Sequence, residues 1–318
     1  MVIKILQKHE CAFSKYKGDI GCSKIVKHEI CTVPRPPVHV PMRRIPMHLE
    51  EQVDQHVEDL LKQNIIRKSQ SPWNAALVVV PKKDGTIRMC VDYRNLNALT
   101  IRPIYPIPDT KHLLDSLSGS AYFSSIDLSS AYYQCEMAEK DKPKTAFATR
   151  KGHFEFNRMP FGLSGAPATF QRLMNLMLEK ENWEICLIYL DDVMIFGRTF
   201  EEHLQRVACV LKRVEDSGLK LSPMKCNFFA KNLQFLGHVV NSDGIKPDPK
   251  KVEKVKNWVK PQNIEDMRSF LGFSNYYRKF IKNYDQHTTP LEEMMKKRQY
   301  QRKQKILSYV DRRSRKII

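Results

Sequence analysis

The chain has 318 residues, with 53 Lys and Arg against 35 Asp and Glu, and its formal net charge is +18. Hydrophobic residues make up 42% of it, which is typical of a globular protein and excludes a wholly disordered chain. Apolar runs such as residues 75–80 are far shorter than the roughly 20 residues of a membrane-spanning helix. The positive charge is spread along the chain and favours a polyanionic partner, although a solubilising surface would have the same composition.

The N-terminus, MVIKILQKHE, lacks the apolar stretch of a secretory signal, so we expect a soluble intracellular protein with no membrane partner. Eight cysteines are scattered without a C-x-x-C pair, which indicates reduced thiols.

The first 45 residues show no clear secondary-structure pattern, whereas the segment that follows predicts a helix and two strands. Residues 1–45 show no regular pattern and end in a proline-rich stretch, so we expect an irregular arm. A helix is expected over 49–64, and two strands over 75–80 and 87–91. Asp84-Gly85 between these strands is a hairpin signal, which puts Lys82 and Lys83 at an exposed tip. Such a tip is either an ordinary turn or a grip for a triphosphate.

The middle of the chain alternates strands with helices and its end is helical, which indicates an α+β core with a helical appendage. A helix should begin after Asp109 and stop at Gly119, because aspartate caps helix starts and glycine ends them. A strand is expected over 122–128 and a helix from Pro167. The remaining expected helices are one from the Thr199 capping box to Gly218, and two over 250–259 and 264–281.

Two adjacent acids, Asp191 and Asp192, stand between two apolar, β-prone runs. On a regular strand neighbouring side chains face opposite ways, so the pair would be split across a sheet. If the chain turns at Asp191-Asp192 instead, both acids lie at the tip of a hairpin. Aspartate is common in turns, so this pattern alone fits either a polar turn or a catalytic pair.

Asp127 is a third acid at the end of an apolar strand. If that strand lies beside the hairpin, three carboxylates converge, and without a cation they would repel one another and their pKa values would rise. Clustered carboxylate oxygens are the ligands that Mg²⁺ needs. Two such ions can activate an attacking hydroxyl and stabilise a leaving pyrophosphate oxygen. The pattern along the chain does not establish this convergence.

The same acids belong to a series of sequence blocks whose order and spacing extend from about residue 28 to residue 294. These blocks are 78–85 (VVVPKKDG) with Trp73, 88–97 (RMCVDYRNLN), 105–108 (YPIP), the Asp127 block, 159–171 (MPFGLSGAPATFQ), 189–192 (YLDD), 235–238 (FLGH) and 270–278 (FLGFSNYYR). In these blocks the chain resembles the reverse transcriptases of gypsy-class long-terminal-repeat retrotransposons.

The resemblance implies an α+β right-hand polymerase with fingers, palm and thumb and an antiparallel palm sheet. It implies an RNA-directed DNA polymerase, a nucleotidyltransferase that extends a primer with deoxynucleoside triphosphates on an RNA or DNA template. Asp127, Asp191 and Asp192 match the metal-binding acids, with Asp127 and Asp191 as principal ligands. The implied cofactor is a pair of Mg²⁺ ions, for which Mn²⁺ can substitute.

The resemblance also implies roles at other positions. Lys82 and Arg88 match cations that hold the incoming triphosphate, and Tyr132 matches the aromatic that packs beneath the sugar and excludes a 2′-hydroxyl. Phe161, Gly162 and Pro167 would shape the nucleotide and template pocket. The residues implied at the primer or template are Tyr189, Leu190, Phe235, Leu236, Gly237, Arg278, Lys279 and Lys282, with 233–240 as the hairpin that grips the primer.

Some of these residues have a structural alternative. Tyr132 could belong to the core, and Arg94 is expected to form an ion pair with Asp92 or another acid. In the thumb helix, Tyr277 is expected to pack with its apolar neighbours, which leaves the basic residues for phosphates.

Two rival functions remain at this point. One is a catalytically inactive, nucleic-acid-binding remnant of a retrotransposon polymerase, which would bind primer–template without extending it. The other is a two-metal nuclease, against which the fingers and primer-grip blocks argue.

The resemblance divides the chain into an N-terminal arm or linker (1–46), fingers and the start of the palm (47–125), palm with interleaved fingers (126–243), and thumb with the start of a connection (244–294). A divergent basic tail (295–318) follows. We expect no protease, ribonuclease H or integrase in this chain. The oligomeric state is left open, and the expected location is the cytoplasm, a virus-like particle or the nucleus.

Overall fold

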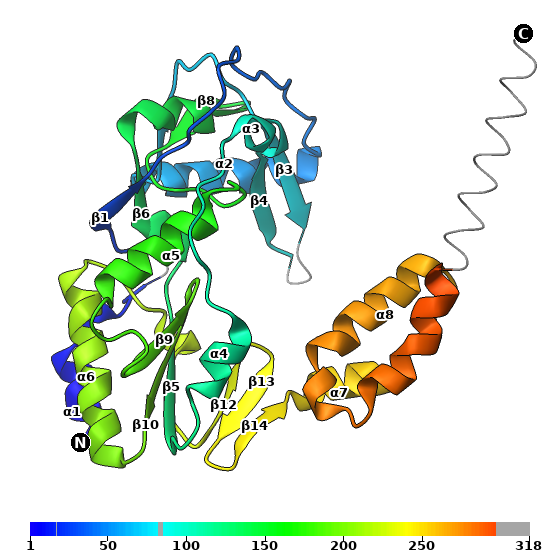
Figure 1. Ribbon diagram of the computed structural model, residues 1–318. Helices are drawn as coiled ribbons and strands as arrows, with labels where there is room; N and C mark the ends of the chain where they lie inside the picture. Colours follow the sequence, from blue (N-terminus) through cyan, green and yellow to red (C-terminus); the bar gives the residue numbers. More distant parts are fainter. Residues whose placement is uncertain (17, 82–84, 297–318) are drawn as a thin grey trace, which may run out of the picture. The chain divides into compact units, whose positions relative to one another are not determined.

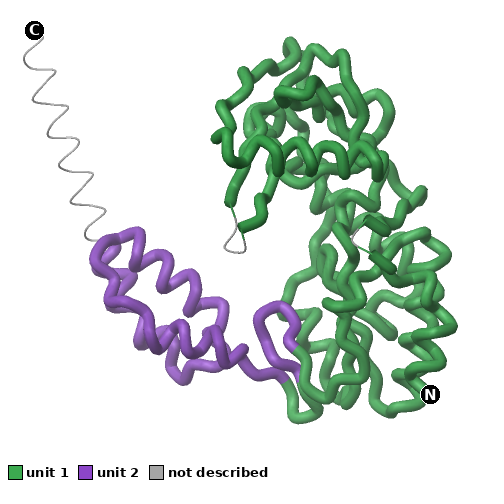
Figure 2. The backbone as a smooth tube through the Cα atoms, turned by 180° about the vertical axis from the view of Figure 1, so that it is seen from behind, with its two compact units in different colours: residues 1–233, 241–244 green, residues 234–240, 245–318 purple. Residues whose placement is uncertain are grey.

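The computed structural model of the chain describes residues 1–16, 18–81 and 85–296. They form two compact units (Figure 2). Unit 1 comprises Met1–Leu233 and Asn241–Gly244, and unit 2 comprises Gln234–Val240 and the chain from Ile245 onward. No helix in the described ranges combines the length and the apolar character needed to span a membrane.

The helices and strands follow the predicted alternation (Figure 1). The labelled α-helices are α1 (Val2–Lys8), α2 (Met47–Lys62), α3 (Arg94–Leu99), α4 (Thr110–Asp115), α5 (Ala166–Met177), α6 (Phe200–Asp216), α7 (Pro249–Lys256) and α8 (Ile264–Tyr276), and residues 284–296 are also helical. Short 3₁₀ segments are η1 (Glu10–Ala12), η2 (Ala131–Gln134), η3 (Glu139–Thr145), η4 (Pro223–Lys225) and η5 (Arg278–Phe280). The strands are β1 (Ser23–His28), β2 (Ile66–Lys68), β3 (Ala76–Pro81), β4 (Ile87–Asp92), β5 (Tyr122–Asp127), β6 (Cys135–Met137), β7 (Phe147–Thr149), β8 (Gly152–Phe156), β9 (Cys186–Tyr189), β10 (Asp192–Gly197), β11 (Asn227–Ala230), β12 (Asn232–Phe235), β13 (His238–Asn241) and β14 (Gly244–Pro247).

The centre of unit 1 is an antiparallel sheet in the order β11-β5-β10-β9, with α5 and α6 on one of its faces (Figure 1). Alternate strand residues such as Ile126 and Val193 enter one buried cluster with the apolar stripes of both helices. The capping box predicted at Thr199 starts α6, because its side chain accepts from the Glu202 N–H and the Glu202 carboxylate accepts from the Thr199 N–H.

A second core of unit 1 lies under α2. Its apolar stripe, with Val53, Val57 and Leu60, packs on Leu77 and on the phenylalanines of a sheet in the order β2-β8-β7. The predicted hairpin is formed by β3 and β4, which pair antiparallel from Ala76 with Asp92 to Pro81 with Ile87. Its tip, with Lys82 and Lys83, lies outside the described residues.

The N-terminal segment differs from the expectation of an irregular arm. Residues 1–31 contain α1, η1 and β1, and β1 pairs in parallel with β6, more than 100 residues away. Ala12 and Ile30 are buried in the core of unit 1. The prediction was wrong because β1 is polar, with the sequence SKIVKH, and its formation depends on a partner strand that no local pattern reveals.

One tripeptide, Asp216-Ser217-Gly218, matches the Asp-Ser-Gly motif of aspartic proteases in sequence alone. Asp216 ends α6, Ser217 is its C-cap, and Gly218 has a φ of 71°, the left-handed conformation that commonly follows a helix end. The tripeptide is therefore a helix terminus.

Unit 2 is built from the β12–β13 turn and the helices that follow it. The predicted helical pieces correspond to α7 and to α8 with η5. Trp258, between the two helices, packs edge-on against Phe270 and at a tilt against Phe273 of α8, at centroid distances of 5.7 and 5.4 Å. The apolar side of α8 thus packs inside the unit, as expected from the sequence.

Candidate active site

Asp127 and Asp192 lie opposite each other on adjacent strands. Asp127 is the last residue of β5, Asp192 is the first residue of β10, and the antiparallel register pairs the two directly. Directly opposed residues face the same side of a sheet, with Cβ atoms about 4.5–5.5 Å apart. Their neighbours Ile126 and Val193 point into the core under α5 and α6, so the two acids lie on the other face. The sheet thus brings together acids that are 65 positions apart in sequence.

Asp191 lies in the turn that joins β9 to β10. Tyr189 pairs with Asp192, so the loop consists of Leu190 and Asp191. Of the two alternatives that the sequence left open, the structure has the hairpin, with its turn one residue before Asp191-Asp192. Leu190 has a φ of 56°, whereas Asp191 is not among the residues with positive φ. A positive φ at only the first loop residue is the pattern of a type II′ turn, where glycine is preferred. Leucine at this position is strained and must be held by other contacts.

The contact that holds this turn comes from Gln171. Its side chain is fully buried in α5, and its Oε1 accepts a hydrogen bond of 2.6 Å from the Leu190 N–H. The Gln171 amide donates to Asn175 Oδ1 at 3.0 Å, and Asn175 donates to the Tyr105 hydroxyl at 3.0 Å. No role was predicted for Gln171. The available signal was a glutamine beside the apolar stripe of a predicted helix, since a buried polar side chain requires partners.

Lys225 is a second residue at the site for which no role was predicted. Its Nζ lies 3.2 Å from Asp127 Oδ1. The backbone fixes this approach, because the Ser222 N–H donates to the Asp127 carbonyl oxygen at 2.8 Å just before η4 begins. No pattern in the sequence relates two positions 98 residues apart.

The carboxylates interact electrostatically. Partial desolvation, followed by the neighbouring charges of Asp191 and Asp127, raises the pKa of Asp192 to about 6, while Lys225 opposes the increase. Carboxylates that disfavour one another's charge in this way are the donor set that a hard divalent cation stabilises. In the described part of the chain, no group of three or more Asp, Glu, His or Cys side chains is arranged to hold one metal ion, and Asp127 is paired with Lys225 instead. The chemistry of the donors fits Mg²⁺, and binding would require Asp127 to exchange its lysine partner for the ion.

Tyr132 lies near these acids. It sits in η2, half-buried, with its ring centroid 5.1 Å from that of Phe161 and 5.6 Å from that of Phe170. Burial, and after it the Asp191 carboxylate, raises the pKa of Tyr132, which indicates that the phenol is close to Asp191. The aromatic pair of Tyr132 and half-exposed Phe161 therefore forms an apolar surface next to the carboxylates.

Comparison with known proteins decides the family. Residues 80–240 match the family described as "Reverse transcriptase (RNA-dependent DNA polymerase)". The chain belongs to the reverse transcriptase family. The Pol polyprotein of transposon 297 from Drosophila melanogaster is 42% identical over 86% of this chain and 26% of the polyprotein. The Pol polyprotein of transposon gypsy from the same organism is 36% identical over 90% of the chain and 28% of the polyprotein.

The fold agrees with this assignment. The structure of a foamy viral protease-reverse transcriptase in complex with an RNA/DNA hybrid covers 92% of this chain with a TM-score of 0.80 and 26% sequence identity; the match spans 40% of the foamy viral chain. The predicted gypsy-class reverse transcriptase and right-hand α+β fold are therefore confirmed. Reverse transcriptases generally use divalent metal ions. The chain spans about a quarter of the length of the transposon polyproteins it matches.

Gly162 and Pro167, which are predicted to shape the nucleotide pocket of this reverse transcriptase, lie just before α5 and in its first turn. The Gly162 carbonyl oxygen accepts from Asn97 Nδ2 at 2.8 Å, and Gly162 has a φ of 95°, a left-handed value that favours glycine. Pro167 occupies the first turn of α5, where its missing N–H leaves no helical bond unmade.

Of the two residues predicted to contact the triphosphate, Arg88 lies among the described residues and Lys82 does not. Arg88 is exposed on β4 and pairs with Val80 of β3, and Lys82 lies outside the described residues. Arg94 donates to Asp92 from both Nε and Nη2, at 2.9 and 2.6 Å, as expected. Arg43 lies 3.2 Å from the same carboxylate, and Arg94, as the main partner, holds the pKa of Asp92 at about 2.

The predicted primer residues fall in both units. Tyr189 ends β9 and Leu190 lies in the acidic turn, both in unit 1. In unit 2, Phe235 is buried and Leu236-Gly237 form the turn between β12 and β13. The three basic residues predicted to contact phosphates, Arg278, Lys279 and Lys282, are all exposed.

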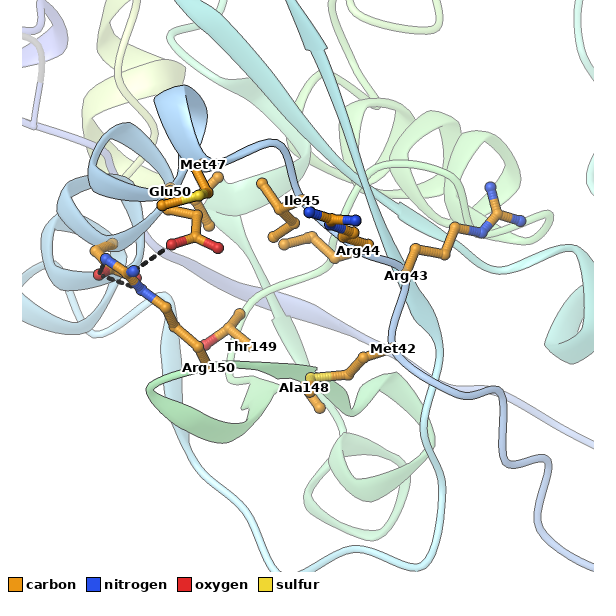
Figure 3. A pocket seen from close by; sticks show the side chains of 12 residues that line it. Met42, Arg43, Arg44, Ile45, Met47, Glu50, Ala148, Thr149 and Arg150 are labelled. Carbon is orange, nitrogen blue, oxygen red and sulfur yellow. Dashed lines mark hydrogen bonds and ion pairs between the residues drawn. The ribbon is translucent and has the colours of Figure 1, made fainter.

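A cavity of about 310 Å³ in unit 1 lies between the segment 42–47 and α2, β3 and β7 (Figure 3). Arg43, Arg44 and Arg150 line it together with apolar side chains, and Arg150 is held by Glu50 and Asp54. None of the predicted site residues lines this cavity as described. The acids lie instead on an open strand end, which suits a polymeric substrate better than an enclosed pocket does.

Proposed function

We propose that this chain is the RNA-directed DNA polymerase of a retrotransposon Pol polyprotein, which extends a primer with deoxynucleoside triphosphates on an RNA or DNA template. The observation that carries the proposal is the direct pairing of Asp127 with Asp192, with Asp191 in the adjoining loop. The family assignment supports it. Such a reaction joins the primer 3′-hydroxyl to the α-phosphorus of the nucleotide and releases pyrophosphate.

The carboxylates would hold the metal cofactor. Asp127 and Asp191 are the proposed principal ligands and Asp192 the third, for two Mg²⁺ ions that Mn²⁺ can replace. When bound, the ions would supply the Lewis acidity of a two-metal phosphoryl transfer. The protein's own contribution is preorganisation. The strands β5 and β10 fix Asp127 and Asp192, and Gln171 fixes the β9–β10 turn that carries Asp191 before substrate arrives.

Further residues of the proposed site would bind the incoming nucleotide. Tyr132 would pack beneath the sugar and exclude a 2′-hydroxyl, which its ring contact with Phe161 and its closeness to Asp191 support. Gly162 and Pro167 would shape the pocket beside it. Lys82 and Arg88 would orient the triphosphate, since two cations offset its charge.

The template and primer would be held through backbone phosphates. Tyr189 and Leu190 would flank the primer end, and Phe235, Leu236 and Gly237 would contact the primer strand. Arg278, Lys279 and Lys282 would bind phosphates, which their exposure supports. The complex of the foamy viral relative with an RNA/DNA hybrid is consistent with this substrate class.

We further propose the division into fingers with the start of the palm (47–125), palm with interleaved fingers (126–243), thumb with the start of a connection (244–294) and basic tail (295–318), preceded by an N-terminal segment (1–46) whose residues Ala12 and Ile30 belong to the core of unit 1. We also propose an intracellular location, in the cytoplasm, a virus-like particle or the nucleus.

Primer extension tests the proposal. The purified chain is given a labelled DNA primer on an RNA template with Mg²⁺ and the four deoxynucleotides. We expect extension by the wild type and a loss of at least about 10³-fold in Asp191→Ala, because charge stabilisation at the reacting phosphate is lost. Asp216→Asn removes an acid of an exposed ion pair on α6 and serves as the control. Tight primer–template binding without extension by the wild type would identify the chain as an inactive remnant.

A further inference from the structure

The turn between β12 and β13 has an unusual composition for its conformation. Its two loop residues, Leu236 and Gly237, both have positive φ, 46° and 73°. Two positive values are the pattern of a type I′ hairpin turn, in which the first position is normally asparagine, aspartate or glycine. Leucine is poorly suited to this conformation, so contacts from elsewhere in unit 2 must select it.

Those contacts converge on the two carbonyl groups of the turn. The Leu236 oxygen accepts from the Tyr276 hydroxyl at 2.6 Å and lies 2.9 Å from His238 Nδ1. The Gly237 oxygen accepts from the Tyr277 hydroxyl at 3.1 Å and from the Asp248 N–H at 3.3 Å. Each carbonyl thus has two neighbouring donor groups, one of them a tyrosine at the end of α8.

The rings of the same residues pack around the turn. The His238 ring is buried, with centroids 5.3 Å from Tyr276 and 5.5 Å from Tyr277. A methyl group on Gly237 would lie 3.0 Å from the Tyr277 hydroxyl oxygen, closer than ordinary contact. Two separate features therefore require glycine at position 237. One is its positive φ, and the other is the Tyr277 hydroxyl, which leaves no room for a side chain.

The chain places cations directly after these tyrosines. Arg278 and Lys279 follow in η5 and are exposed. Lys279 is close enough to the turn to act on His238, whose pKa is lowered by burial and by that charge. Protein donors bind both turn carbonyls, so little negative partial charge on the turn is left to repel a polyanion. The neighbouring cations attract the polyanion.

We propose that Tyr276 and Tyr277 are positioning residues that hold the Leu236–Gly237 turn in the one conformation that contacts the primer strand. The inference rests on the proposed polymerase function and explains how unit 2 fixes the conformation of the turn that would contact the primer. The ligand is the sugar–phosphate backbone of a nucleic-acid strand, and the tyrosines act on it only through the turn.

The test removes the two hydroxyl groups and keeps the rings. Tyr276→Phe, Tyr277→Phe and the double variant are compared with Tyr284→Phe. Tyr284 is the matched control, because its hydroxyl lies in the same helical unit but bonds to Ser274 Oγ at 3.0 Å and not to the turn. Primer extension gives kcat and KM for primer–template and for nucleotide, and a competitor trap gives the dissociation rate of labelled primer–template without nucleotide.

We expect each single variant to raise the KM for primer–template and the dissociation rate about fivefold, as loss of one hydrogen bond predicts. The KM for the nucleotide should not change, and Tyr284→Phe should match the wild type. A merely structural role would lower the unfolding temperature of all three single variants alike without this split in KM.

A double-mutant cycle adds an independent readout. Gly237→Ala forces a methyl group against the Tyr277 hydroxyl, so part of its defect should be relieved in the Tyr277→Phe background. Strict additivity would contradict the proposed contact.

The outcomes separate this inference from the proposed function. If the wild type extends primers and Tyr276→Phe and Tyr277→Phe behave like Tyr284→Phe, the inference is wrong and the polymerase proposal stands. If the wild type does not extend, the polymerase proposal fails, and the dissociation rates still decide whether the tyrosines hold the nucleic-acid contact.

Discussion

The turn joining β9 to β10 and the turn joining β12 to β13 each contain two residues, and each begins with a leucine of positive φ, 56° at Leu190 and 46° at Leu236. Both are held from a helix. A buried glutamine of α5 accepts from the backbone N–H of Leu190, whereas a tyrosine of α8 donates to the backbone carbonyl of Leu236. The two turns are thus anchored by opposite ends of the peptide group.

This difference fits what each turn carries. The first turn carries the Asp191 carboxylate and leads directly to Asp192 at the start of β10, and the placement of both acids depends on a rigid anchor within the protein core. The second turn bears no charge of its own, and its anchoring hydroxyls neutralise the carbonyls that would face a phosphate backbone. A change at the first anchor should therefore affect the chemical step, and a change at the second should affect nucleic-acid binding.

The largest effect is expected from Gln171→Leu. This variant keeps an apolar fit in α5 but leaves the Leu190 N–H without its acceptor and frees the acidic turn. We expect kcat for primer extension to fall about 10- to 100-fold, with the KM for primer–template nearly unchanged. Steady-state kinetics measure both.

Gln205→Leu on the exposed face of α6 is the matched control and should retain full activity. If Gln171→Leu raised the primer–template KM and left kcat intact, the assignment of the two turns to different steps would be wrong.

A second effect follows from the charge of Asp192, which lies next to the β9–β10 turn. The pKa of Asp192 rises from 3.8 to about 6 on folding, so its protonated form favours the folded state. In metal-free protein this contribution is fully present below pH 3.8 and is lost as the pH rises through about 6. Denaturant unfolding at pH 4 to 7 should therefore show wild type losing stability relative to Asp192→Asn across that window.

Mg²⁺ should oppose this loss in the wild type, because it stabilises the charged carboxylates. Identical pH profiles for wild type and Asp192→Asn would show that the carboxylates do not interact as described.

The smallest effect is expected on stability, when each of the two leucines, Leu190 and Leu236, is replaced by alanine or by glycine. Replacement by alanine or by glycine removes the same side-chain contacts, but only glycine adopts positive φ freely. At each turn the glycine variant should be more stable than the alanine variant by about 1 kcal/mol. Urea unfolding of Leu190→Gly and Leu190→Ala, and of the same pair at Leu236, measures this. A difference at one turn alone would mean that the two turns do not share the same strain.

Much of this architecture could be predicted where the signals are local. The capping box at Thr199, the β3–β4 hairpin and the start of α5 at Pro167 were all correctly predicted, because each depends on residues a few positions apart. For the Asp191-Asp192 pair the sequence left a regular strand and a hairpin open, and the structure has a hairpin whose turn is Leu190-Asp191.

What could not be predicted depends on distant partners. β1 forms only against β6, and Lys225 reaches Asp127 only because η4 follows a backbone bond to the end of β5. The convergence of Asp127 with Asp192 was expected from family resemblance, since strand order in a sheet is set by packing of the whole core and not by any local pattern. The roles of the site residues stay predictions.

The central claim is that Asp127, Asp191 and Asp192 together bind divalent ions, and calorimetric titration with Mn²⁺ at pH 7 tests it most directly. We predict saturable binding by the wild type that is lost in Asp127→Asn combined with Asp192→Asn, with Asp216→Asn unchanged. Equal Mn²⁺ binding by the wild type and the double variant would contradict the account.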